Sequence, residues 1–166
     1  MRREAARAFA LVALLAPLAA RADEAPCAAC TYRGDLEALF VPARSLGDGW
    51  ETLGESPVDP QEDPDLREAG VRAARSLHYT HAIPGGAEVC SVEIWSFGSA
   101  EEARRARMGM ERERWRFSLQ GNLLVMLRGV TLQRDRGLRP GLLPACHRLA
   151  DLTEARARSL LRPAGR

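Results

Sequence analysis

Two runs of alternating residues joined by a tight turn constrain the fold of this chain more than any other feature. Apolar residues alternate with polar or small ones over 76–83, a Pro-Gly-Gly turn occupies 84–86, and the alternation resumes over 87–97. Successive residues of a strand point to opposite faces of a sheet, and a short link containing glycine joins antiparallel neighbours. The pattern therefore predicts a β-hairpin, and the fold must include a sheet with at least one buried face.

Further elements are predicted on both sides of this hairpin. The sequence Ser99-Ala100-Glu101-Glu102 matches a capping box, in which the Ser hydroxyl and a Glu carboxylate satisfy amides at a helix start, so we expect a helix over 100–116. The run 123–127 is apolar at every position and follows a turn, which predicts a buried strand. The segments expected upstream are a short strand over 50–53, an acidic proline-rich loop over 55–65 and a helix over 66–75.

These elements follow one another in the order β-α-β-β-α-β. The order is typical of α+β domains of ferredoxin-like type, in which a split antiparallel sheet carries both helices on one face. Leu149, Leu152 and Leu160 predict an additional C-terminal helix that Pro163 ends, and a short helix is expected over 35–40. We therefore predict a ferredoxin-like α+β domain with an added C-terminal helix.

The first 22 residues have the pattern of a cleavable secretory signal peptide. Three arginines precede the uncharged apolar run 8–16, and Ala20 and Ala22 supply the small residues that a signal peptidase requires. The run is shorter than the about 20 residues that cross a bilayer, so no transmembrane anchor is expected. We expect export to a bacterial periplasm or the medium. The predicted regions are a signal peptide over 1–22, an N-terminal segment with a Cys-x-x-Cys pair over 23–46, and a single α+β domain over 47–166.

The charge of the exported chain argues against binding to nucleic acid. The whole sequence has 24 basic and 22 acidic residues, and all of the basic ones are arginine. Four arginines and one glutamate lie in the predicted signal peptide, which leaves 20 basic against 21 acidic residues, a net charge of −1. Proteins that bind DNA or RNA usually carry a strong positive field, and this chain has none after cleavage.

Four cysteines remain after the predicted cleavage, and an even number in an oxidising compartment favours two disulfides. Three pairings are possible. Cys90 lies on the face of its predicted strand that the helices should cover, so its partner must come from a covering element. Cys146, at the start of the C-terminal helix, is a candidate, and Cys27 would then pair with Cys30.

Two alternative roles for Cys27 and Cys30 are considered. As a Cys-x-x-Cys pair they could exchange thiols and disulfides, although the motif lies near the mature N-terminus and not after a strand, as it does in thioredoxin-like domains. They could also bind a transition metal together with His147 or His81. His78 and His81 are three residues apart on a predicted strand and should point to opposite faces, so they are not expected to share an ion.

No sequence motif predicts a catalytic chemistry, and no cofactor is expected. The chain contains no GxSxG, HExxH, GxGxxG or Walker pattern. Met108 and Trp115, seven residues apart in the predicted helix, lie opposite its core stripe and mark a possible surface for a protein partner or a small apolar ligand. We predict an exported, disulfide-stabilised domain with a non-catalytic role in binding or assembly, and the two roles above remain alternatives. The sequence does not indicate an oligomeric state.

Overall fold

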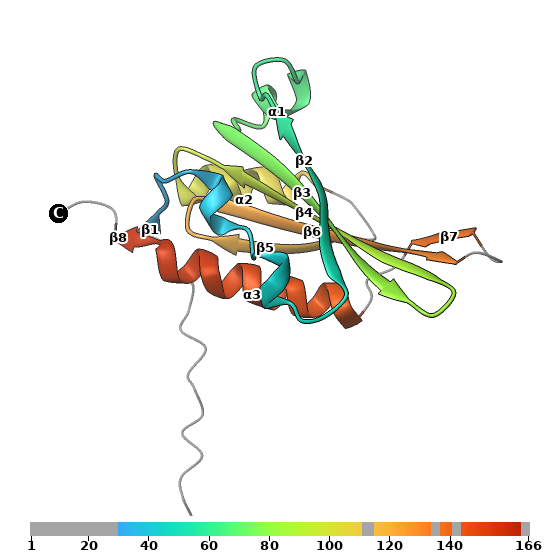
Figure 1. Cartoon of the computed structure of the whole chain (residues 1–166). Helices are drawn as coiled ribbons and strands as arrows, with labels where there is room; N and C mark the ends of the chain where they lie inside the picture. Colours follow the sequence, from blue (N-terminus) through green and yellow to red (C-terminus); the bar gives the residue numbers. More distant parts are fainter. Residues whose placement is uncertain (1–29, 111–114, 134–136, 141–143, 164–166) are drawn as a thin grey trace, which may run out of the picture.

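The predicted hairpin forms the middle of a twisted antiparallel sheet (Figure 1). The computed structural model describes residues 30–110, 115–133, 137–140 and 144–163. The hairpin strands are β3 (Ala73–Ile83) and β4 (Gly86–Ser96), and they pair in one continuous register from Ala73 opposite Ser96 to Ile83 opposite Gly86. Gly85 turns the chain with φ of 78°, which a residue with a side chain rarely adopts. The alternation in the sequence therefore predicted this hairpin correctly.

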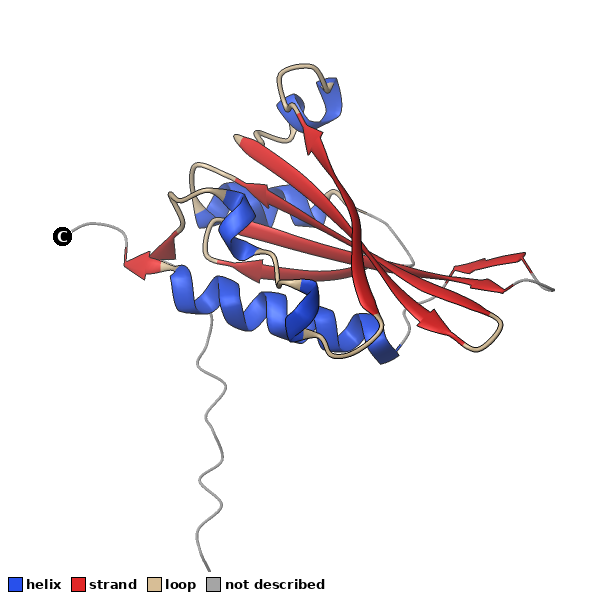
Figure 2. Cartoon of the chain, in the orientation of Figure 1, coloured by secondary structure: helices blue, strands red, loops and turns tan. Residues whose placement is uncertain are grey.

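Four more strands complete the large sheet, and helices flank it (Figure 2). The strands are β2 (Trp50–Val58), β5 (Arg116–Gln120), β6 (Leu123–Gln133) and β7 (Gly137–Pro140). The helices are the 3₁₀ turns η1 (Leu36–Leu39) and η2 (Ala43–Ser45) and the α-helices α1 (Pro64–Glu68), α2 (Ala100–Met108) and α3 (Pro144–Leu160). Two short strands, β1 (Cys30–Thr31) and β8 (Arg162–Pro163), pair apart from the large sheet. The chain thus has an α+β fold with a C-terminal helix, as expected.

The strand order differs from the predicted ferredoxin-like order. The strands lie side by side as β2-β3-β4-β6-β5, with β7 beside the outer part of β6, and every pair is antiparallel. A ferredoxin-like sheet would place β2 beside β4, which requires the chain between β2 and β3 to return along the whole sheet. The five residues of α1 extend only about 8 Å, against about 30 Å for β2. The chain therefore turns back at the sheet end, and β3 pairs directly with β2.

The helices lie on both faces of the sheet. The two internal helices share one face, as predicted, since Leu66 of α1 and Ala103 of α2 belong to one core, but this face is not the Cys90 face, which α3 covers. On one face, α3 and η1 cover the β4 residues Cys90, Val92 and Ile94. On the other face, Trp95 and Phe97 pack with Ala103 of α2 in a second core. The physical reason lies in β6, whose residues Leu123 to Leu127 are all buried and alternate between the two cores. A strand that is apolar on both faces needs a layer on each side.

Several element boundaries also differ from the predictions. Strand β2 continues through Glu55 to Val58, so the first part of the predicted proline loop is an edge strand, where proline is tolerated. The helix expected over 66–75 ends at Glu68, because β3 begins at Ala73. Helix α2 begins at the predicted capping box but ends at Met108, followed by Gly109 as its C-cap. The residues from Arg116 form strand β5, which the sequence pattern had assigned to the helix end.

The described part of the N-terminal segment packs into the same core as the rest of the chain. Asn122, buried in the turn before β6, accepts a bond from the Tyr32 amide (2.6 Å) and donates to the carbonyls of Tyr32 (3.1 Å) and Phe97 (2.8 Å). A Cβ on Gly121 would lie 2.3 Å from the Cys30 carbonyl oxygen, so only glycine permits this close approach. The described segment that begins at Cys30 is therefore an integral part of the same domain. In the described part of the chain, no helix combines the length and apolar character that a bilayer crossing needs.

Candidate functional site

A buried disulfide ties the start of α3 to the middle of the sheet. Cys90 of β4 and Cys146 of α3 are bonded, with their Cα atoms 5.6 Å apart, and neither side chain is exposed to solvent. This is the pairing that the strand pattern suggested for Cys90. Cys30 is also not a free thiol. Its predicted partner, Cys27, lies outside the described residues, so the Cys27–Cys30 pairing and its redox role stay predictions.

The Cys90–Cys146 disulfide is next to a group of aromatic and charged side chains on the same face of the sheet. Cys90 is opposite Tyr79 on β3, and two residues toward the turn His81 is opposite Glu88. Trp50, at the start of β2, is in turn opposite His81. These pairs follow from the hairpin register, because cross-strand neighbours on one face lie about 5 Å apart. Trp50, His81 and Glu88 therefore form a row across three strands at the edge of the α3-covered core.

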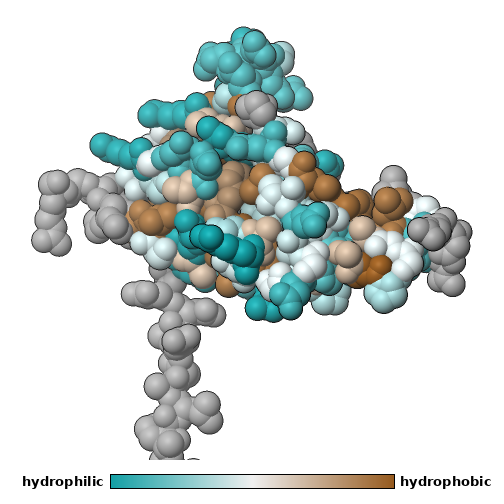
Figure 3. Space-filling model, in the orientation of Figure 1, coloured by the Kyte–Doolittle hydropathy of each residue, from teal (hydrophilic) through white to brown (hydrophobic). Residues whose placement is uncertain are grey.

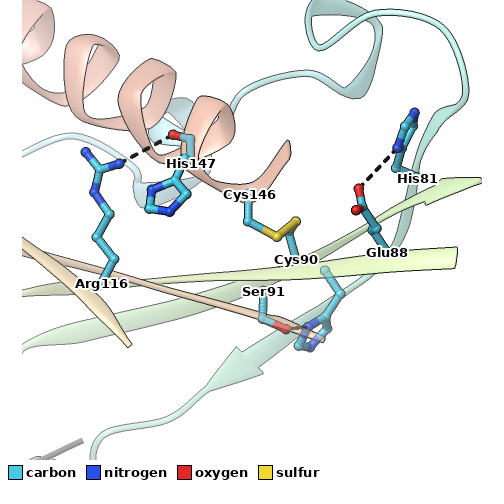
Figure 4. The surroundings of a disulfide bond; sticks show 8 residues. His81, Glu88, Cys90, Ser91, Arg116, Cys146 and His147 are labelled. Atoms are coloured by element: carbon cyan, nitrogen blue, oxygen red, sulfur yellow. Dashed lines mark hydrogen bonds and ion pairs between the residues drawn. A yellow bond between two sulfur atoms is a disulfide. The ribbon is translucent and has the colours of Figure 1, made fainter. Parts of the chain in front are cut away.

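A pocket of about 360 Å³ lies between this row and the start of α3. Trp50 and His81 form its floor, and the described residues that line it also include the loop Leu46–Asp48 and three residues of α3, namely Pro144, Ala145 and Arg148. Such a volume is at the small end of the range for ligand sites in proteins. The Cys90–Cys146 bond holds the first turn of α3, and hence one wall, at a fixed place relative to the floor (Figure 4).

His81 is held by contacts on both sides of its ring. Its Nδ1 is 3.4 Å from Oε2 of Glu88, and its ring stacks on Trp50 with centroids 5.0 Å apart and planes at 18°. Gly49, with φ of 79°, lies against the Cδ2–Nε2 edge, where a Cβ would be 3.4 Å from Cδ2. The imidazole is thus oriented by Glu88, and the Trp50–His81 stack offers a flat aromatic surface.

Two oppositely charged side chains line the same pocket. Asp48 belongs to the loop before β2 and Arg148 to the second turn of α3, and both are solvent-exposed. Within the part of the chain that the structure describes, neither side chain forms a hydrogen bond or an ion pair. A carboxylate and a guanidinium therefore border the Trp50–His81 floor with no partner among the described residues. The described lining contains no Ser, Thr, Cys or Lys, and Asp48 and His81 are its residues of a type that can act as a nucleophile.

The structure does not bring the described candidates for metal ligands together. His147 lies near the start of α3, where its carbonyl accepts a bond from Arg116 (3.5 Å), while His81 faces Glu88. Figure 4 draws the two histidines to either side of the Cys90–Cys146 bond. Among the residues that the structure describes, no group of three or more His, Cys, Asp or Glu side chains is placed to hold an ion. Cys27 lies outside that group, so a metal site that includes it stays a prediction.

The predicted partner surface at Met108 and Trp115 has a different geometry from the one expected. Met108 ends α2 with 75% of its surface exposed, whereas Trp115 lies beyond the helix, next to β5. The Trp115 ring stacks on Phe117 at 6.5 Å and lies under the Arg128 guanidinium at 4.9 Å. The seven-residue helical spacing therefore does not apply, and the chain itself covers part of the indole. A role for Met108 and Trp115 in contacting a partner stays a prediction.

Hydrophobic residues also reach the surface elsewhere. Figure 3 shows the end of the molecule that carries α1 as almost wholly hydrophilic, with hydrophobic colour across the middle of the view and toward the β7 end. Leu53 in the edge strand β2 and Leu132 in the outer part of β6 are 59% and 47% exposed. These residues belong to different strands and lie outside the pocket lining.

Comparison with protein-family models found no match, and searches of the curated proteins and of the solved structures found no significant similarity.

Sequence reasoning found His81 but missed the other pocket residues. Trp50 was assigned only to a short strand, and Asp48 and Arg148 were not considered as a pair, because they are 100 positions apart in the sequence. A local signal did exist at one wall, since Gly47-Asp48-Gly49 before a strand marks an unusual backbone path, confirmed by the positive φ of both glycines. The second wall depends on how α3 packs, which no local pattern reports.

Proposed function

We propose that this chain is an exported, disulfide-stabilised binding protein that performs no chemistry of its own, and that the pocket between Trp50, His81 and α3 holds a small ligand. The supporting observation is the construction of this pocket: its aromatic floor belongs to the sheet, and its far wall is tied to the sheet by the buried Cys90–Cys146 bond. A preformed site loses less conformational entropy when a ligand binds.

Three further features support this proposal. The pocket combines an apolar floor with a few polar groups, as small-molecule sites usually do. Its described lining has no Ser, Thr, Cys or Lys, and its His81 is engaged by Glu88 and Trp50, which favours binding over covalent catalysis. The predicted signal peptide and the cysteine content suit a periplasmic location, where disulfides form readily.

The test uses protein purified from a bacterial periplasm without reductant, whose intact mass should match a chain that begins at Asp23. A panel of small aromatic and aliphatic acids, amines, alcohols and amino acids is added at millimolar concentration, and NMR follows the Trp50 indole and the His81 imidazole. We expect at least one chemical class to shift both signals in a saturable manner.

Two variants define the site in this experiment. Trp50→Ala removes its own indole signal and half of the pocket floor, so it should abolish the saturable shift of the His81 imidazole. His78→Ala is the matched control, since His78 is also half-buried on β3 but bonds Ser91 (2.8 Å) and does not line the pocket. The proposal is refuted if no class shifts the two signals, or if binding is unchanged in Trp50→Ala.

A further inference from the structure

The charged residues around the pocket constrain the chemistry of the ligand more closely than the pocket volume does. Arg148 and Asp48 stand on different elements, line the same apolar floor and have no bonding partner among the described residues. A guanidinium binds carboxylates through charge-assisted hydrogen bonds, and a carboxylate binds ammonium groups in the same way. A ligand that satisfies both groups must carry both charges and an apolar part for the floor.

We infer that the pocket binds a free α-amino acid with an apolar, preferably aromatic, side chain. This inference rests on the proposed function and adds the chemical class of the ligand. The α-carboxylate pairs with Arg148, the α-ammonium pairs with Asp48, and the side chain lies on the Trp50–His81 stack. A flat side chain gains most there, because aromatic rings pack well in offset stacks.

The size of the pocket and its remaining walls agree with this class. A volume of about 360 Å³ suits an amino acid better than a nucleotide or a large cofactor. Leu46, which is buried, and Pro144 provide apolar contacts beside the stack. His81 is directed by Glu88 and contributes its ring face, so the ligand's charges are recognised by Asp48 and Arg148.

Four matched probes separate the contributions of the two charges. L-Phenylalanine carries both charges, 3-phenylpropanoate lacks the ammonium, 2-phenylethylamine lacks the carboxylate, and 2-phenylethanol lacks both. Calorimetric or NMR titration should rank L-phenylalanine first, with each missing charge weakening binding about two- to fivefold, as the loss of a solvent-exposed ion pair would.

Variants assign each charge to its partner. Arg148→Gln should weaken binding of L-phenylalanine and 3-phenylpropanoate about two- to fivefold and leave 2-phenylethylamine unchanged. Asp48→Asn should weaken L-phenylalanine and 2-phenylethylamine to a similar extent and leave 3-phenylpropanoate unchanged. Arg158→Gln, an exposed arginine on the same helix that does not line the pocket, is the control and should change nothing.

The outcomes are distinct for the two proposals. If 3-phenylpropanoate or 2-phenylethylamine binds as tightly as L-phenylalanine, or if Arg148→Gln weakens all four probes equally, the amino-acid inference is wrong while the binding function stands. If none of the four probes binds but another class of the wider panel does, the inference fails alone. If nothing binds at all, both proposals fail.

Discussion

Removal of the Cys90–Cys146 disulfide should destabilise the fold by an amount that follows from its position in the chain. The two cysteines are 56 residues apart, so the bond closes a long loop in the unfolded chain. In the loop-entropy model, a loop of this length removes about 14 cal/mol/K of unfolded-state entropy, or about 4 kcal/mol at 25 °C. We therefore expect Cys90→Ala/Cys146→Ala to lower the free energy of unfolding by about 4 kcal/mol, a large share of the stability of an average domain.

The assay is guanidinium unfolding followed by tryptophan fluorescence, without reductant, for the wild-type chain and the double variant. A loss of about 4 kcal/mol should also lower Tm by roughly 15 °C for a domain of this size. The control is Cys27→Ala/Cys30→Ala. These positions are three residues apart, so even a bond between them closes a very short loop and should contribute about 2 kcal/mol or less.

Reduced wild-type protein should unfold at or somewhat below the midpoint of Cys90→Ala/Cys146→Ala, because reduction removes this cross-link together with the predicted Cys27–Cys30 bond. A loss below about 1 kcal/mol for the double variant would refute the entropy argument, since the unfolded chain would then gain little freedom from the cut. A larger effect in Cys27→Ala/Cys30→Ala than in Cys90→Ala/Cys146→Ala would refute the assignment of the main cross-link to α3.

Two further predictions concern buried polar groups. Burial raises the pKa of Tyr79 above its ordinary value of 10.0, and its hydroxyl donates to the Val41 carbonyl (2.8 Å), so the folded state favours the neutral phenol. The stability that the buried Tyr79 hydroxyl contributes is therefore complete below pH 10 and is lost as the pH rises above 10. Tyr79→Phe should lower the free energy of unfolding by about 1–2 kcal/mol at pH 7. Between pH 9 and 11, the urea midpoint should fall more steeply in the wild type than in Tyr79→Phe. Parallel midpoints would contradict this. Asn122→Ala leaves the Tyr32 amide and two carbonyls without partners. It should lower the free energy of unfolding, measured in urea, by about 3 kcal/mol and speed hydrogen exchange at the Tyr32 amide. A loss below about 1 kcal/mol would show that water replaces these bonds.

The parts of the fold that the sequence predicted well are governed by local rules. Alternation over 76–97 predicted the hairpin, and the capping box at Ser99 predicted the start of α2 to the residue. Both signals come from neighbouring residues, which constrain the backbone whatever else the chain does. The end of α2 was missed because Glu and Arg residues after Met108 suit a helix surface, although Gly109 offered a stop signal.

The strand order was predicted wrongly because it depends on residues far apart in the sequence. Local patterns list the elements, but the partner of a strand depends on whether the connection between two strands is long enough to cross the sheet. The short α1 forces β3 to pair with β2, and the apolar run Leu123 to Leu127 demands cover on both faces.

The sequence by itself determined the hairpin, the helix start at Ser99, the C-terminal helix and the expectation that Cys90 faces a covering element. Only the tertiary structure decided that α3 lies opposite α2 and that its first turn faces Trp50 and His81. The physical reason is that alternation and capping act between residues a few positions apart, whereas the pocket joins Asp48 to Arg148 through the packing of a whole helix on a sheet. Such packing depends on the total apolar surface to be buried, which no local pattern contains.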